Sequence, residues 1–219
     1  MADRPIIFSP PMIRALLDGR KTQTRRIIKP SPEFCGGGRS RDPQNWNDPD
    51  AWGWENYDEG CWDLLSEGYT GRPFYAPGDR LWVREAFSYE SLDVDRNGFM
   101  PPWYWADGKP ESGDFTRPKP SIHMPRWASR LTLIVTDVRV QRLQEISEDD
   151  ARAEGVTPHG GGWTGYGRDA DLWLSNAKDG FRSLWNSIHG PGAWDASPWV
   201  CAISFDMLRG NIDDTEVGG

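Results

Sequence analysis

Cysteine is scarce in this chain, and the few cysteines follow no functional spacing. The sequence contains three, Cys35, Cys61 and Cys201, which form neither a Cys-x-x-Cys pair nor the even-numbered framework of a disulfide-stapled fold. Isolated cysteines of this kind are usual in a reducing compartment. We therefore expect a cytoplasmic protein.

Histidine, long apolar runs and the common catalytic motifs are also rare or missing. The three histidines, His123, His159 and His189, lie too far apart for metal-ligand spacing, so we expect no zinc site. No apolar run approaches membrane-spanning length, and the N-terminal residues do not resemble a secretory signal. The sequence has neither a Walker loop nor a Gly-x-Ser-x-Gly elbow, which excludes the commonest phosphate-binding and serine-hydrolase signatures.

Tryptophan, glycine and proline are abundant instead. The 219 residues include 13 Trp, 24 Gly and 18 Pro, a composition typical of a loop-rich fold whose long connections are anchored by indole rings. The same aromatic side chains can alternatively line a pocket that stacks a planar ligand. We expect two long insertions, at about 31–76 and 88–115, within a single domain that spans residues 1–209, followed by an acidic flexible tail over 210–219.

The charge of the chain is negative overall but unevenly distributed. A net charge of −8 argues against a protein that coats nucleic acid without sequence preference. Residues 1–30, however, hold seven Lys and Arg against two Asp, and residues 117–142 hold six Lys and Arg against one Asp. If these two stretches meet in the fold, they form a local basic cleft that suits a small anionic or nucleotide-like ligand.

The order of the expected elements indicates an α+β fold. Short strands are predicted at 6–8, 80–87, 103–105, 131–143 and 199–205. Helices are predicted at 10–18, from Ser147 and at about 171–189, with a further short helix near 61–66. Several strands with few helices and no β-α-β alternation favour a small mixed β-barrel with flanking helices.

The segment Gly19–Arg26 follows directly on the first predicted helix and has the richest chemistry in the chain. Lys21 and Thr24 can act as a base and a nucleophile, provided that a turn or a bulge brings them to one side. An ordinary lysine is almost fully protonated at pH 7, so this role requires burial or the neighbouring charges of Arg25 and Arg26. From spacing alone, a solvated lysine on a basic loop is the favoured interpretation, and the same residues can equally form a basic contact to nucleic acid.

Three further regions contain candidate site residues. Glu154 ends the helix that Ser147 begins, just before Gly155, and is a candidate acid; Glu85, on a strand, is a second one. The loop 121–127 combines His123, Arg126 and Trp127, of which Arg126 can contact an anion and Trp127 can stack on a base or pack structurally.

Gly19-x-Lys21-x-x-Thr24-x-Arg26 resembles the signature of ASCH domains, a PUA-like β-barrel family. The surrounding sequence is similar to the larger ASCH proteins of bacteriophages and prophages, which implies a host or phage-infected bacterial cytoplasm. Within the family, a bacterial branch that hydrolyses N4-acetylcytidine has the pattern G-R-K-T-x-T-x-R, which this chain matches from Gly19 through Arg20 and Thr22 to Arg26.

The resemblance implies roles for individual residues. Lys21 carries over as the base and Thr24 as the nucleophile, and Glu154 carries over as the proton donor through the run Ala151-x-x-Glu154. The mechanism needs no metal and no organic cofactor. The candidate substrate-binding residues lie in the motif, on the strand that contains Glu85 and in the loop 121–127. They are Arg20, Arg25, Arg26, Glu85, His123, Arg126 and Trp127.

These observations lead to one principal hypothesis and two alternatives. The principal hypothesis is an amidohydrolase that removes an acyl group from N4-acylated cytosine nucleosides or nucleotides. The first alternative is an RNA- or single-stranded-DNA-binding ASCH module without catalysis. The second is an accessory protein that binds another protein, for which the sequence offers no specific feature.

Overall fold

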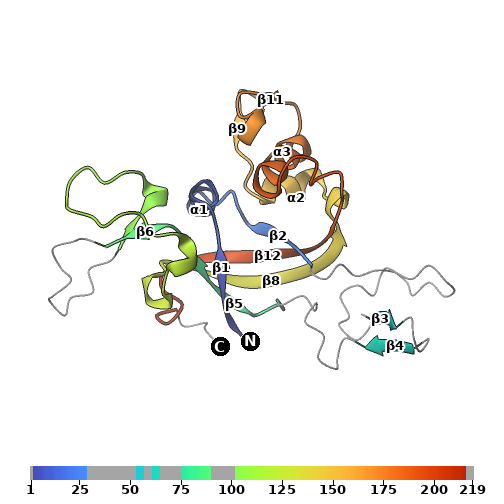
Figure 1. Cartoon of the computed structure of the whole chain (residues 1–219), viewed down its shortest axis with the longest axis horizontal. Coiled ribbons are helices and arrows are strands. Elements are labelled where there is room, and N and C mark those ends of the chain that lie inside the picture. The colour runs from blue at the N-terminus through green and yellow to red at the C-terminus, as the bar shows by residue number, and fades with distance from the viewer. Residues whose placement is uncertain (1, 29–52, 57–60, 65–74, 90–101, 216–219) are drawn as a thin grey trace. The chain divides into compact units, whose positions relative to one another are not determined.

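A computed structural model describes residues 2–28, 53–56, 61–64, 75–89 and 102–215 of the chain (Figure 1). Within these residues the fold is α+β, with one five-stranded mixed sheet, three smaller sheets and three α-helices. The α+β class expected from the sequence is confirmed. The described strands do not close into a barrel.

The main sheet has the strand order β1-β5-β8-β12-β2. Its strands are β1 (Asp3–Ile7), β5 (Arg80–Arg84), β8 (Leu131–Arg142), β12 (Trp199–Arg209) and β2 (Gln23–Ile27). β1 runs parallel to β5, whereas β5 pairs with β8 and β12 with β2 in the antiparallel sense. Alternation along β5 buries Leu81 and Val83 and leaves their neighbours half-buried, as expected for a strand with one core face.

The chain divides into two compact units. The first unit comprises residues 1–22, 77–136 and 205–219, and the second comprises 23–76 and 137–204. The unit boundaries fall within β8 and within β12, and also between Thr22 and Gln23, inside the segment Gly19–Arg26.

Helix α1 (Pro10–Leu17) of the first unit forms where its local signals place it. Ser9 is the N-cap residue, prolines occupy the first turn, and Met12, Ile13 and Leu16 are buried. Gly19 has a φ of 71°, the left-handed conformation that ends a helix at low steric cost. The predicted helix is confirmed, and its end fixes the point from which the motif segment emerges.

A second part of the first unit is a hairpin with three short 3₁₀ turns. β6 (Phe87–Ser88) pairs antiparallel with β7 (Trp103–Tyr104). The turns are η4 (Trp105–Asp107), η5 (Ser121–His123) and η6 (Arg126–Ala128). Phe87, Met124 and Ala128 form a small buried cluster against which Tyr89 and Tyr104 pack, so the loop from 121 to 128 is attached to the hairpin through apolar contacts.

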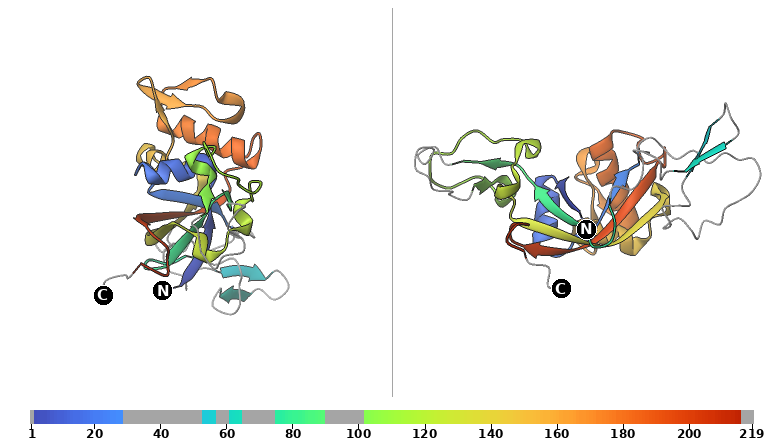
Figure 2. Two further views of the ribbon diagram at one scale, coloured as in Figure 1. Left: turned by 90° about the vertical axis from the view of Figure 1, so that its left-hand side faces the viewer. Right: turned by 90° about the horizontal axis from the view of Figure 1, so that it is seen from below.

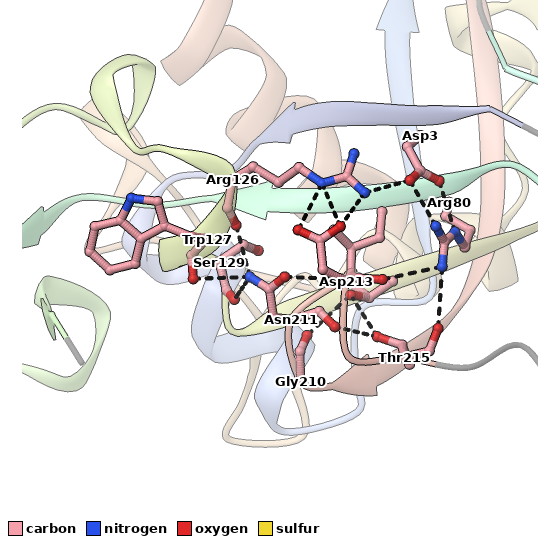
Figure 3. A network of polar contacts seen from close by, with 11 residues as sticks. Asp3, Arg80, Arg126, Trp127, Ser129, Gly210, Asn211, Asp213 and Thr215 are labelled. Atoms are coloured by element: carbon pink, nitrogen blue, oxygen red, sulfur yellow. Dashed lines mark hydrogen bonds and ion pairs between the residues drawn. The ribbon is translucent and has the colours of Figure 1, made fainter. Parts of the chain in front are cut away.

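Residues 210–215 were expected to begin a flexible tail, but they fold back onto the first unit. Ile212 is completely buried. The Asn211 side-chain amide donates to the carbonyl oxygens of Arg126, Trp127 and Ser129 at 2.8–3.0 Å. Figure 3 shows this network, which fastens the 121–129 loop to the C-terminal segment.

The second unit contains helices α2 (Glu148–Ala153) and α3 (Ala177–His189), which pack against each other. A small sheet of β9 (Pro158–His159), β10 (Gly162–Thr164) and β11 (Trp173–Leu174) lies against α3, as Figure 2 shows. Short 3₁₀ turns, η7 (Leu143–Glu145) and η8 (Gly167–Asp169), complete the unit. The glycine-rich region 159–168 contains β10 and parts of β9 and η8.

Capping side chains set the starts of both helices. The Ser147 hydroxyl accepts a hydrogen bond from the Asp150 amide, so the predicted start of α2 is confirmed. The Asn176 side chain accepts from the Asp179 amide in the same way, so α3 begins at Ala177 rather than near 171. The apolar residues at 172–174 that suggested an earlier start belong largely to β11.

Of the expected insertion at 31–76, the structure describes one hairpin and the final residues. β3 (Gly53–Asn56) pairs antiparallel with β4 (Cys61–Leu64), so the short helix expected near 61–66 is wrong at those four positions. Two of the tryptophans in this insertion, Trp46 and Trp52, lie outside the described residues. None of the helices in the described segments has the length and apolar character required to cross a bilayer.

Candidate functional site

The segment Gly19–Arg26 changes from a turn to a strand. The backbone N–H groups of Arg20 and Lys21 both donate to the Ala15 carbonyl, at 2.9 and 3.0 Å, and so extend the last turn of α1. From Gln23 onward the chain is extended as β2. The segment thus passes from the last turn of α1 to strand β2 between Lys21 and Gln23.

Lys21 is buried, with only 2% of its surface exposed. Its ammonium lies 5.5 Å from the centre of the Phe8 ring, within cation–π range. Lysine is among the residues least often buried in proteins, because desolvation of the ammonium is costly. A buried lysine directly after a helix end favours a specific role over the solvated loop that spacing alone allowed. Arg20 forms an exposed ion pair with Asp18.

Strand β2 carries the second half of the motif in the second unit. Thr24 is opposite Ile203 of β12 and is 4% exposed. Because side chains alternate along a strand, Thr24 and Arg26 share one face of β2, and Gln23 and Arg25 share the other. The guanidinium of Arg26 is thereby placed on the same side of the strand as the Thr24 hydroxyl.

Arg25 is the centre of a buried polar cluster. Its guanidinium donates to Gln23 Oε1, to Glu154 Oε1 at 3.0 Å and to Asp150 Oδ2 at 2.9 Å, with no exposed side-chain surface. The same guanidinium lies 5.8 Å from the centre of the Phe181 ring of α3. Arg25 thus connects β2 with α2 and α3, and within the second unit it acts as a positioning residue for the two carboxylates.

Glu154 is held in this cluster by the end of α2. It is the C-cap residue, its N–H donates to the Asp150 carbonyl at 2.9 Å, and it is 3% exposed. The structure therefore brings the candidate acid next to the motif strand, although 129 residues separate Arg25 from Glu154 in the sequence. Asp150, on the same helix, is part of the same cluster.

Burial and charge interactions in the second unit shift the pKa values of Arg26 and Asp150. Burial lowers the pKa of Arg26 from its usual value, while Tyr75 and Glu154 partly oppose this change. Burial by itself would raise the pKa of Asp150, but the hydrogen bond from Arg139, the charges of Arg25 and Arg139 and the Gln23 amide outweigh it, so the net shift is downward. Arg26 and Glu154 are thus electrostatically coupled across the cluster.

The lowered pKa of Asp150 predicts a loss of stability in acid. A carboxyl whose pKa is lower in the folded state contributes stability above its ordinary pKa of 3.8, and this contribution is lost as the pH falls through the folded value. Urea unfolding between pH 6 and 3 should show this decline, and Asp150→Asn should flatten it. An equally steep decline in Asp150→Asn and in the wild type would contradict the assignment, and Asp149→Asn, on the exposed side of α2, is the control.

Glu85, the second candidate acid, belongs to a different cluster, in the first unit. It is 1% exposed and pairs with the Arg130 guanidinium through both carboxylate oxygens, at 2.8 and 3.0 Å. Arg130 also pairs with Asp107 and lies 4.0 Å from the centre of the Tyr104 ring. Burial raises the pKa of Glu85, while the Arg130 hydrogen bonds oppose this shift. This cluster joins β5 to the hairpin and favours a structural role for Glu85.

The loop residues His123, Arg126 and Trp127 also lie in the first unit. Arg126 pairs with Asp213 and with Asp3, each at 2.6 Å, as Figure 3 shows. These hydrogen bonds raise the pKa of Arg126 further above its usual value. His123 is exposed on η5, and Trp127 is 43% exposed. The ion pairs of Arg126 thus hold the loop 121–127 in place, whereas the indole of Trp127 faces away from them.

The basic cleft expected from two cationic stretches is largely neutralised by carboxylates. Within the first unit the two stretches do meet, through the pair of Asp3 with Arg126. Most of their arginines have acidic partners on the described residues: Arg4, Arg20, Arg25, Arg126, Arg130 and Arg139. A net count of positive charges therefore overstates the attraction of this surface for a polyanion.

The described residues contain no group of three or more His, Cys, Asp or Glu side chains arranged to hold a metal ion. Comparisons with known protein families, with characterised proteins and with solved structures gave no significant match to this chain.

Proposed function

We propose that this protein is an amidohydrolase that removes the acyl group from N4-acylated cytosine nucleosides or nucleotides. The observation that carries the proposal is the contact of buried Glu154 with the motif strand, where Arg25 pairs with it at 3.0 Å and its charge acts on Arg26, which shares a face of β2 with Thr24. It joins the motif strand to the one carboxylate that the ASCH resemblance designates as the proton donor. The proposal also implies the PUA-like architecture of that family.

The burial of the three proposed catalytic side chains gives further support. Lys21, Thr24 and Glu154 are all polar, and each is at most 4% exposed. Catalytic groups are frequently found in such desolvated positions, because a low-polarity environment strengthens charge interactions. Arg26 lies on the same face of β2 as Thr24, where a donor for a developing oxyanion is required.

The proposed reaction proceeds in two balanced steps. Lys21 takes the proton of the Thr24 hydroxyl, and Thr24 Oγ1 attacks the acyl carbonyl while Arg26 donates to the oxyanion. The C–N4 bond breaks, Glu154 in its protonated form delivers a proton to N4, and the free cytosine amino group leaves. Water then attacks the acyl-Thr24 ester and gives a proton to Glu154, while Lys21 returns its proton to Thr24 Oγ1. The products are the carboxylic acid and the restored enzyme.

Incubation with N4-acetylcytidine tests this proposal directly. We expect the protein to release cytidine and acetate at a rate proportional to protein concentration and unaffected by a chelator. Lys21→Ala should abolish the release, whereas Lys109→Ala, which removes an exposed lysine of the same unit, should retain it. Absence of cytidine release by the wild-type protein, or full activity of Lys21→Ala, would refute the proposal.

A further inference from the structure

The segment from Phe115 to Thr136 contains no acidic residue. Within the first unit, Arg126 and Arg130 of this segment pair with carboxylates from elsewhere in the fold. Arg117 and Lys119 are exposed, and the described residues give them no carboxylate partner. The cationic character of this surface is therefore concentrated at Arg117 and Lys119, next to the loop that carries Trp127.

Two aromatic rings and a lysine form a continuous set on this surface. Trp127 stacks on Tyr89, with ring centres 6.0 Å apart and an angle of 21° between the planes. The Lys119 ammonium lies 4.5 Å from the centre of the Tyr89 ring. Tyr89 in turn packs edge-on against buried Phe87, at 5.2 Å. The partly exposed indole thus belongs to a ring stack that begins in the core of the unit.

The loop that carries Trp127 is held in place by several hydrogen bonds to its backbone carbonyls, although the Trp127 side chain is partly exposed. The Asn211 amide binds the carbonyls of Arg126, Trp127 and Ser129, and the Tyr104 hydroxyl binds the Ala128 carbonyl at 2.9 Å. Figure 3 shows the indole directed away from this network. An aromatic ring that is 43% exposed and already held in place loses little conformational entropy when a ligand stacks on it.

We propose that Trp127, Tyr89 and Lys119 form a base-stacking site for single-stranded nucleic acid. An unpaired base stacks on the indole, which any base can do because every base has a π-face. Lys119 and Arg117 contact the adjacent phosphates. Single-stranded nucleic acid fits better than a protein partner, because the site combines a flat aromatic surface with cations and the surrounding segment contains no acid.

This binding site goes beyond the proposed hydrolysis and does not depend on it. It consists entirely of residues of the first unit, and its ligand needs no acyl group.

Fluorescence anisotropy with labelled, unacylated oligocytidylate of about ten nucleotides tests the proposal. We expect the wild-type protein to bind both the RNA and the DNA oligomer, and a duplex of the same length much more weakly because its bases are already stacked. Trp127→Ala should weaken binding by roughly 5- to 100-fold. Lys119→Gln should weaken it less and reduce its salt dependence.

Trp173→Ala is the matched control, because Trp173 is 55% exposed but lies against the glycine-rich turn 160–162 of the second unit. It should bind as the wild type does. Asn211→Ala tests whether the hydrogen bonds that hold the Trp127 loop matter for binding, since the Asn211 side chain donates to three carbonyls of this loop. We expect weaker binding with an unchanged preference for single strands. Equal affinities of Trp127→Ala and the wild type, equal binding of the duplex, or no binding at all would overturn the proposal.

Discussion

Replacement of Thr24 by valine is expected to lower the turnover of N4-acetylcytidine by about three orders of magnitude or more, because it removes the only atom that can form the acyl-enzyme bond. Valine keeps the shape and the strand preference of threonine, so β2 and its pairing with Ile203 should be retained. Steady-state rates with purified protein measure the effect, and the far-UV circular dichroism spectrum monitors the fold.

Two further variants make this prediction specific. Thr24→Ser restores a hydroxyl at the same position and should recover a measurable part of the activity. Thr136→Val changes an exposed threonine on β8 in the same way and should leave the turnover unchanged. Unchanged turnover in Thr24→Val would exclude Thr24 as the nucleophile even if the protein proves to be an amidohydrolase.

Replacement of Arg25 by methionine is expected to destabilise the second unit by about 3–5 kcal/mol, because it leaves the buried carboxylate of Glu154 and the half-buried carboxylate of Asp150 without their shared guanidinium. For a chain of this size such a change lowers Tm by roughly 6–20 °C. Urea unfolding at pH 7 measures it directly, through a lower midpoint at an unchanged slope.

Arg152→Met is the matched control for this effect. Arg152 pairs with Asp149 across one turn of α2, and both side chains are largely exposed. A surface pair of this kind contributes about 0–1 kcal/mol, so the midpoint should change little. Arg25→Met combined with Glu154→Leu should recover part of the lost stability, because an apolar replacement removes the buried charge. Equal stability losses in Arg25→Met and Arg152→Met would contradict the role of Arg25 as the centre of the cluster.

The sequence predicted those elements whose determinants are local. Helix α1 has its cap, its prolines and its terminating glycine between Ser9 and Gly19, and the start of α2 depends on Ser147 and Asp150 alone. The start of α3 was misplaced because apolar residues at 172–174 continue the helical pattern, whereas the cap at Asn176 decides where the helix begins. The sequence pattern predicts a short helix near 61–66, but residues 61–64 pair with β3 and form a strand.

The contacts that define the candidate site were harder to predict, because they are non-local. Glu154 was identified from its helix end and the resemblance, but the ion pair that holds it depends on Arg25, far away in the sequence. Counting basic residues likewise missed the neutralisation of Arg126 and Arg130 by carboxylates from distant segments. Nothing in the composition of residues 210–215 indicated that Asn211 would support the Trp127 loop; only the fold reveals it.

The central claim is that Thr24 carries the acyl group during turnover. Acid quenching of the protein during steady-state hydrolysis of N4-acetylcytidine, followed by peptide mass spectrometry, tests this claim most directly. We predict one acetyl group on the peptide that contains Thr24, located at that residue by fragmentation and absent from Thr24→Val. A synthetic peptide that carries an acetyl-threonine ester is the control and should survive the same quench and digestion. If it survives, cytidine release without any acetylated Thr24 would contradict the claim.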